Sequence, residues 1–296
     1  MRDLVYNALV PLGSSLSLQR LRCLGTILGR LMWAALPGRR TETVRTIAER
    51  LHVSQKEATT LARASFCHSA QSFLEIFHSR HIDCRFLHNQ IVYDNPALVH
   101  ALQTTTRPVV AVTAHFGCWE LLVGLIGLFS PDRECQAVVR LPKDQALAHA
   151  IMHMRSHPGV RILPHRDAAT HLLGHLRSGG KAAFLVDHNC RHDEAEFLPF
   201  LGQIAAVNKG PAILALRAKA QVWPIFPLRL RQGGFRLIVQ PPLDTTTLTG
   251  SRQERITALC RFYTQAVESM VLRWPEQWFW MHRRWKTQPQ RQDHAS

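Results

Sequence analysis

The stretch Val109-Val110-Ala111-Val112-Thr113-Ala114-His115-Phe116-Gly117 decides the fold. Residues 109–114 are uncharged and rich in β-branched side chains, which predicts a strand buried on both faces within a parallel sheet. Gly117 allows the chain to turn, and a helix-like stretch from Trp119 to Phe129 follows. A buried strand that leads directly into a helix is the basic unit of α/β proteins.

The same alternation recurs downstream. Strands are expected at 135–139, 159–163, 181–186 and 221–228, with helices at 144–156, 168–177 and 208–219. This pattern predicts an α/β fold with a largely parallel central sheet flanked by helices. Residues 235–239 follow Gly233-Gly234 and predict an antiparallel edge strand formed through a hairpin, before a last helix at about 253–273.

The N-terminal part of the chain is expected to be helical, with residues 41–80 nearly free of Gly and Pro. On a helix over 21–36, apolar residues gather on one face with arginines around it, which suits the surface of an anionic membrane. A core helix with a basic edge is an equally good interpretation. Because Arg22 and Arg30 interrupt this stretch and polar residues interrupt 4–19, neither is expected to span a bilayer.

Composition indicates a globular protein with anionic partners. The 296 residues are 46% hydrophobic, which excludes a disordered basic tail, and 36 Lys plus Arg against 21 Asp plus Glu give a net charge of +15. Such a charge favours nucleic acid, an anionic membrane, acidic proteins or phosphorylated substrates. The seven cysteines form no C-x-x-C pair, which argues against a zinc ribbon and for a reducing compartment. No signal peptide is evident, so the chain is expected to stay inside the cell.

The strongest candidate site lies where the strand 109–114 ends. His115 stands at the carboxyl edge of that strand, where open α/β sheets bind ligands, and Glu120 follows five residues later. A carboxylate on one ring nitrogen of a histidine fixes the tautomer and stabilises the imidazolium, which suits a general base. Gly117 and the start of the next helix would help to bind an anion. The pattern H-x-x-x-x-E also arises by chance, so a histidine satisfied by backbone groups is the alternative.

Two further strands should bring side chains to the same edge. Arg140 ends the strand 135–139 and suits a phosphate or an oxyanion, although an ordinary surface arginine is the alternative. Asp187 and His188 follow the strand 181–186, and the aromatic and apolar stretch 197–203 is interpreted as a loop that forms another wall of the cleft.

Five blocks, in this order, resemble those of the late acyltransferases of lipid A biosynthesis, the bacterial lauroyl and myristoyl transferase family. They are HFGCWEL at 115–121, VRLPKD at 139–144, VDH at 186–188, FLPFLG at 197–202 and WFWMHRRWK at 278–286. The resemblance implies acyl transfer from an acyl carrier protein thioester to a lipid hydroxyl at the cytoplasmic face of the inner membrane. Coenzyme A is the alternative carrier of the acyl chain.

The resemblance also assigns roles to residues. His115 would be the general base oriented by Glu120, Arg140 would hold a phosphate or the oxyanion, and Asp187 would order the basic cluster or the acceptor. It implies no metal, no cofactor and no covalent enzyme intermediate, so Cys118 is not expected to be a nucleophile. Residues 1–80 would be the membrane-contacting helical region, and 81–296 the catalytic domain, as one continuous unit.

Two departures from the family pattern leave the acceptor open. The long uncharged N-terminal span of many members is shortened or absent, and Thr43-Val44-Arg45-Thr46-Ile47 replaces an expected basic block. The acceptor could be a lipid A precursor or another glycolipid or phospholipid. A catalytically silent lipid-binding protein of the same fold is the alternative function.

The C-terminal segment combines aromatic and basic residues. Trp274, Trp278, Trp280 and Trp285 lie among basic residues that include Arg283 and Arg284, an arrangement that suits membrane headgroups, with the two arginines as candidate substrate ligands. Single-stranded nucleic acid is less favoured, because no nucleic-acid-binding module is recognisable. A metal-dependent hydrolase built on Asp187, His188 and His192 is a minor option, because metal-ligand spacing such as H-E-x-x-H is missing.

Overall fold

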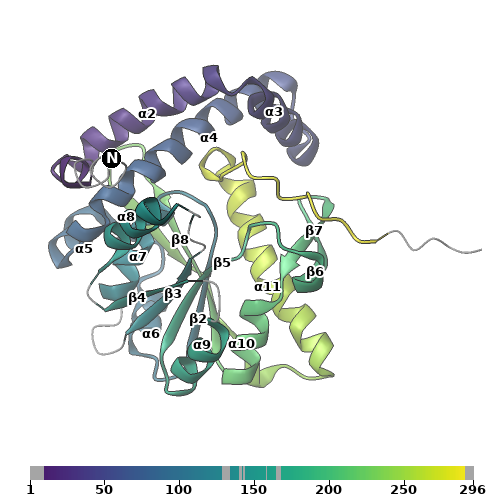
Figure 1. The fold of residues 1–296 in the computed structure, drawn as a ribbon. Helices are drawn as coiled ribbons and strands as arrows, with labels where there is room; N and C mark the ends of the chain where they lie inside the picture. The colour runs from purple at the N-terminus through teal and green to yellow at the C-terminus, as the bar shows by residue number, and fades with distance from the viewer. Residues whose placement is uncertain are drawn as a thin grey trace, which may run out of the picture.

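The computed structural model describes residues 10–128, 134–139, 142, 144–157, 159–164 and 168–290 (Figure 1). The helices are α2 Leu18–Ala35, α3 Pro37–Leu51, α4 Gln55–Glu75, α5 Cys84–Gln90, α6 Pro96–Thr104, α7 Trp119–Leu128, α8 Gln145–Arg155, α9 Ala168–Arg177, α10 Gly210–Ala218 and α11 Arg252–Arg273, with 3-10 turns η1 Ile76–His81 and η4 Pro275–Gln277 among the short ones. The strands are β1 Ile91–Tyr93, β2 Val109–Thr113, β3 Cys135–Val139, β4 Val160–Pro164, β5 Lys181–Leu185, β6 Ala195–Phe200, β7 Gln203–Asn208, β8 Gln221–Arg229, β9 Phe235–Val239 and β10 Leu243–Asp244.

The central sheet has the strand order β1-β9-β8-β2-β5-β3-β4, and β10 pairs with β8. The five strands from β8 to β4 run parallel, which confirms the predicted α/β fold with a largely parallel sheet. β9 pairs antiparallel with β8 as expected, but it is not an edge strand, because β1 adds beside it in parallel. With only three residues, β1 carries too short a pattern to be predicted.

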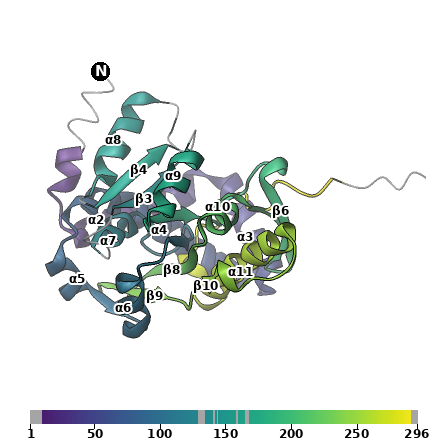
Figure 2. The ribbon, with the colours of Figure 1, turned by 90° about the horizontal axis from the view of Figure 1, so that it is seen from below.

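β2 lies between the two main apolar cores. All five of its residues are buried, and they alternate between the two faces of the sheet. Val110 and Val112 join a core with α10 and α11, while Val109 and Ala111 join a core with α7. Figures 1 and 2 show α10 and α11 on the other side of the sheet from α7. The uncharged composition that predicted this strand follows from burial on both faces.

The helices α2 and α4 pack closely at the N-terminal end of the chain. A side chain at Gly25 or Gly29 of α2 would place its Cβ 2.5 Å from the backbone of α4, so glycine permits this approach. The opposite face of α2 is exposed, with Leu24 at 45%, Ile27 at 54% and Leu31 at 61% of their accessible surface. No helix among the described residues has both the length and the apolar run needed to cross a bilayer.

Two predictions about the C-terminal half are wrong. The stretch 197–203 is no loop but part of the antiparallel hairpin β6–β7, which turns at Leu201 and Gly202, both with positive φ. Trp278 and Trp280 do not face a membrane, because they are 1% and 3% exposed and their rings pack against each other 4.6 Å apart. Burying two large rings inside the protein gains more free energy than leaving them at a wet interface.

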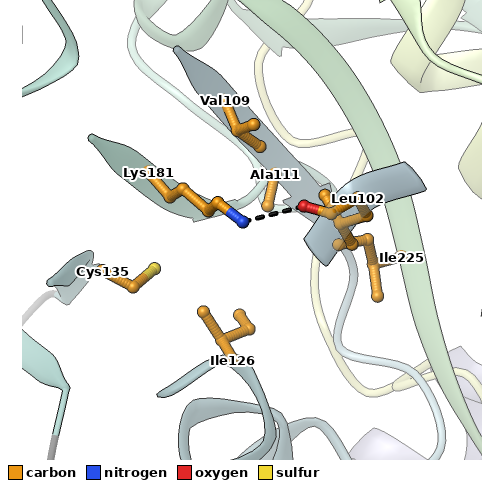
Figure 3. Close-up of a pocket in the computed structure, with 7 residues that line it drawn as sticks. All are labelled: Leu102, Val109, Ala111, Ile126, Cys135, Lys181 and Ile225. Carbon is orange, nitrogen blue, oxygen red and sulfur yellow. Dashed lines mark hydrogen bonds between the residues drawn. The ribbon is translucent and has the colours of Figure 1, made fainter. Parts of the chain in front are cut away.

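A small cavity lies at the opposite end of the parallel strands from His115. Lys181, the first residue of β5, is buried there, and its Nζ donates a hydrogen bond of 2.8 Å to the carbonyl of Leu102 near the end of α6 (Figure 3). The remaining lining side chains are apolar apart from Cys135. A cation at a helix C-terminus is stabilised by the helix dipole, so this lysine has a structural explanation.

Candidate active site

His115 and Asp187 form a hydrogen-bonded pair at the carboxyl edge of the sheet. The imidazole Nδ1 lies 2.9 Å from Asp187 Oδ1, and the backbone N–H of His115 donates to Asp187 Oδ2, also at 2.9 Å. Asp187 is 3% exposed, whereas the His115 side chain is 27% exposed. An ionised carboxylate at Nδ1 fixes the tautomer that carries its proton there, which leaves the lone pair on Nε2.

The strand order explains why residues 72 positions apart meet. β2 and β5 are neighbours in parallel register, with Thr113 opposite Leu185 and with the amide of Val186 bonded to the carbonyl of Thr113 at 2.9 Å. His115 and Asp187 each follow two residues after these strand ends. This contact confirms the prediction that Asp187 lies at the same edge of the sheet as His115.

The segment after η4 donates further hydrogen bonds to this pair. The Trp278 indole N–H donates to Asp187 Oδ2 at 2.8 Å, and the amide of Phe279 donates to the carbonyl of His115 at 3.0 Å. Asp187 therefore accepts hydrogen bonds from three donors in a buried position. Sequence reasoning assigned Trp278 to a membrane surface and missed this role, because no local pattern links the segment to the sheet.

The two side chains change each other's pKa. Burial alone would lower the pKa of His115, but the charge and hydrogen bond of Asp187 raise it above its ordinary value, with a smaller contribution from Glu120. Burial alone would raise the pKa of Asp187, but His115 and the Trp278 indole lower it well below its ordinary value. The pair thus favours an ionised Asp187 and an imidazole that is more basic than usual.

Glu120 is not the carboxylate that contacts the His115 ring. Its two oxygens accept hydrogen bonds of 2.8 and 2.6 Å from the guanidinium of Arg155, at the end of α8, and one accepts a bond of 3.2 Å from the Trp119 indole. Glu120 is 5% exposed, and its charge raises the pKa of Arg155 despite burial. The expectation that Glu120 orients the imidazole is corrected, because Asp187 occupies that position and Glu120 is held on the first turn of α7.

Three aromatic rings border His115, and they come from different parts of the chain. Trp119 lies 5.5 Å and Phe279 6.0 Å from the imidazole, measured between ring centroids. Phe73 of α4 packs edge-on against both rings, 5.7 Å from each. We call Phe73, Trp119 and Phe279 the aromatic collar. Phe73 is 38% exposed, so the collar reaches the surface of the protein.

Gly117 fixes the turn that follows His115. Its φ is +58°, and a Cβ there would lie 1.8 Å from the carbonyl oxygen of Pro227. Its N–H donates to the Gln277 carbonyl at 2.9 Å, and its carbonyl accepts hydrogen bonds from Ser72 Oγ and from Arg229 at 3.2 Å. These hydrogen bonds engage both the N–H and the carbonyl of Gly117, and the expectation that Gly117 contacts the substrate stays a prediction.

A buried ion-pair cluster supports the same turn. The guanidinium of Arg229 donates to both oxygens of Glu75, at 3.1 and 2.5 Å, and Glu75 also accepts a bond of 3.0 Å from Arg22. Glu75 is fully buried and Arg229 is 6% exposed. No sequence signal distinguished these residues, because their charges lie on a helix and a strand that meet only in the fold.

The other predicted site residues are dispersed. Arg140 lies outside the described residues. His188 lies beside the pair, and burial lowers its pKa although Asp187 opposes this shift. Arg283 is 56% exposed and lies 3.5 Å from Glu42 of α3. Arg284 is only 2% exposed and donates to the carbonyls of Ala206, at 2.5 Å, and His188, at 3.4 Å, which places it inside the protein and not at a surface open to a ligand.

Cys118 and the metal hypothesis both lack support in the geometry. Cys118 is fully buried and burial raises the pKa of its thiol well above the ordinary value, which disfavours a nucleophilic thiolate. Among the described residues, no three His, Cys, Asp or Glu side chains are grouped to bind a metal ion. The ring of His192 instead lies 5.0 Å from that of Phe197.

Comparisons with known proteins agree with one another. The family model of the bacterial lipid A biosynthesis acyltransferases matches residues 5–287. The chain is 26% identical to the lipid A biosynthesis lauroyltransferase of Escherichia coli K12, over 65% of this chain and 60% of that protein. It is also 26% identical to the lipid A biosynthesis palmitoleoyltransferase of the same organism, over 63% of this chain and 58% of that protein. The match thus spans about three fifths of the length of these curated relatives.

A solved structure shows only a loose resemblance. The 1-acyl-sn-glycerophosphate acyltransferase PlsC from Thermotoga maritima aligns with a TM-score of 0.37 and 11% identity, over 84% of this chain and 97% of that one.

Proposed function

We propose, because the chain belongs to the family of bacterial lipid A biosynthesis acyltransferases, that it moves a fatty acyl chain from a thioester to a hydroxyl of a lipid A precursor or a related lipid. The donor would be an acyl carrier protein, with coenzyme A as the alternative. The observation that carries the proposal is the hydrogen-bonded His115–Asp187 pair, whose imidazole lies beside an aromatic collar with one exposed ring.

In the proposed reaction His115 acts as the general base. Nε2 takes the proton of the acceptor hydroxyl while that oxygen attacks the thioester carbonyl carbon, and the C=O electron pair moves to oxygen. When the tetrahedral intermediate collapses, the C–S bond breaks and the thiol leaves with the proton from Nε2. The new bond is an oxygen ester, and His115 returns to its neutral form. This cycle requires no metal, no cofactor and no covalent bond to the enzyme.

Asp187 is proposed as the partner that makes this base effective. Its carboxylate accepts from Nδ1 and the backbone N–H of His115, so it orients the ring and stabilises the imidazolium that forms during attack. The Trp278 indole holds the carboxylate in place at 2.8 Å. Glu120 is proposed to act at longer range, through its charge and through Arg155 and Trp119.

Stabilisation of the oxyanion and binding of the acceptor need positive charge at this edge. Arg140 comes directly after β3 in the sequence, and β3 is the neighbour of β5, so we retain Arg140 as the proposed ligand of the oxyanion or of an acceptor phosphate. The exposed Arg283 and the neighbouring His188 are further candidates for the acceptor. Gly117 and Arg284 are proposed to position the turn and the β6–β7 hairpin, since their contacts are internal.

The proposed location is the cytoplasmic face of the inner membrane, where the protein would bind peripherally or as a monotopic protein. The outward face of α2 presents Leu24, Ile27 and Leu31 to solvent, and Arg20 and Arg30 on the same helix are exposed too. Apolar side chains with cationic neighbours suit anionic headgroups. Residues 1–80 would supply this contact, and 81–296 would carry the chemistry together with α4, whose Ser72 and Phe73 reach the site.

Acyl transfer can be tested with purified protein, an acyl carrier protein thioester and a phosphorylated lipid A precursor. We expect an acylated product by mass spectrometry, and no product with His115→Ala. A protein that binds the acceptor in anionic vesicles but never consumes the thioester, across donors of several chain lengths, would refute the proposal. Normal turnover by His115→Ala would refute the assigned base.

A further inference from the structure

We propose that the aromatic collar of Phe73, Trp119 and Phe279 is the contact site for the donor's acyl chain and sets the chain length that the enzyme prefers. This inference rests on the proposed acyl transfer and adds the side chains that meet the hydrocarbon. The three residues come from α4, α7 and the segment after η4, and their rings contact one another at 5.7 to 6.1 Å between centroids.

Reaction geometry brings the hydrocarbon to these rings. The attacking oxygen must lie about 2.6–3.2 Å from Nε2 of His115, and the thioester carbon about 3–3.5 Å from that oxygen. The first methylenes of the chain therefore lie within a few bond lengths of the imidazole. Trp119 and Phe279, 5.5 and 6.0 Å from the imidazole between centroids, provide apolar surface at that distance.

The collar has a buried inner ring and an exposed outer ring. Trp119 is 5% exposed, whereas Phe73 is 38% exposed although its ring packs on both other members. A partly exposed aromatic ring that packs on the two rings bordering the imidazole gains from an apolar ligand that covers it. A chain that starts at His115 and passes Trp119 would reach Phe73 last, so Phe73 should sense its more distant methylenes.

The inner ring is held rigidly, which length discrimination requires. The Trp119 indole N–H donates to Glu120 at 3.2 Å, and Arg155 holds Glu120 by two charged hydrogen bonds. A side chain that cannot move makes each additional methylene change the binding free energy of the acyl chain, whereas a side chain that can move accommodates the longer chain. Glu120 and Arg155 would thus be positioning residues for the collar.

A competition assay tests the collar. The full-length protein receives the acceptor and an equal mixture of two carrier-protein thioesters, one with a short and one with a long saturated chain, and mass spectrometry gives the product ratio. We expect Phe73→Ala and Trp119→Phe each to change this ratio by about tenfold, because a few methylenes lose or gain contacts. Val92→Ala is the matched control, since Val92 is an exposed apolar residue on β1, three strands from β2.

Equilibrium binding separates this inference from the proposed function. Calorimetry with S-alkyl pantetheine thioethers of the same two lengths, which cannot transfer, should show the same length dependence and its loss in Phe73→Ala. Binding with this dependence, but without any transfer of the thioesters, would support the collar and refute the enzyme activity. Transfer by Phe73→Ala and Trp119→Phe with the native product ratio would overturn the collar while leaving the enzyme activity intact.

Discussion

The carboxylate of Asp187 holds His115 at two points, its ring Nδ1 and its backbone N–H, each at 2.9 Å. A carboxylate that fixes both the side chain and the main chain of one residue leaves the imidazole little freedom to rotate. The orientation of Nε2 is therefore built into the junction of β2 and β5, and the first predictions follow from this contact.

Asp187→Asn should lower kcat by about 100-fold or more, because the amide carries no charge to stabilise the imidazolium and can present its NH₂ to Nδ1. Steady-state kinetics of acyl transfer would measure the loss. Asp244→Asn is the control. Asp244 lies on β10, at the other end of the sheet from His115, and accepts a hydrogen bond from Arg107. Equal losses in both variants would show that the effect is structural and not catalytic.

The pH dependence of kcat/KM should report the raised pKa of His115. The base acts only when neutral, so the rate should fall as the pH drops through a value above the ordinary 6.5 of histidine. Asp187→Asn removes the charge that raises the pKa of His115, whereas burial still lowers that pKa. The residual kcat/KM should therefore rise with pH at a lower pH than in the native protein. A limb at the same pH in both proteins would contradict the pairing.

Arg155 and Glu120 should be coupled in stability. Glu120 is buried and Arg155 is largely covered, and each is the other's charged partner, so Arg155→Met or Glu120→Leu alone should lower the free energy of unfolding by about 3–5 kcal/mol. The double variant should recover part of that loss, because it leaves neither charge unpaired. Urea unfolding of the four proteins measures this double-mutant cycle, and strictly additive losses would rule out the coupling.

Gly117→Ala should destabilise the fold by at least about 1–3 kcal/mol, because it combines a positive φ with a Cβ that overlaps the Pro227 carbonyl. Activity should fall with it, as the turn that follows His115 must move. Gly174→Ala on α9 has no atom within 4 Å of its new Cβ and should instead gain about 0.5–1 kcal/mol of helix propensity. Thermal melting should therefore give a lower melting temperature for Gly117→Ala and a higher one for Gly174→Ala than for the native protein.

The sequence predicts the parts of this molecule whose pattern is local. β2, β3 and β5 are short and mostly apolar, and their predicted bounds agree with the structure to within one residue, because burial leaves a clear signal. For the hairpin β6–β7 the sequence predicts a loop at 197–203 instead, since Pro199 and Gly202 interrupt the alternation of a strand.

The spacing of residues in the sequence does not predict which carboxylate bonds to His115. Glu120 is near in sequence, but packing directs its side chain to Arg155, whereas Asp187 arrives through a strand order that no local pattern encodes. Trp278, 91 positions after Asp187, is still less accessible to sequence reasoning, because tryptophan and arginine together suit a membrane as well as a core.

The indole of Trp278 on Asp187 has a consequence for synthesis. The ribosome synthesises β2, β5 and the whole parallel sheet well before it reaches Trp278. A nascent chain can therefore hold His115 and Asp187 close together before the indole donates its hydrogen bond to Asp187. Catalytic competence then arises at the end of folding, when the segment after η4 packs beside α4. Recovery of activity during refolding should therefore lag behind recovery of secondary structure.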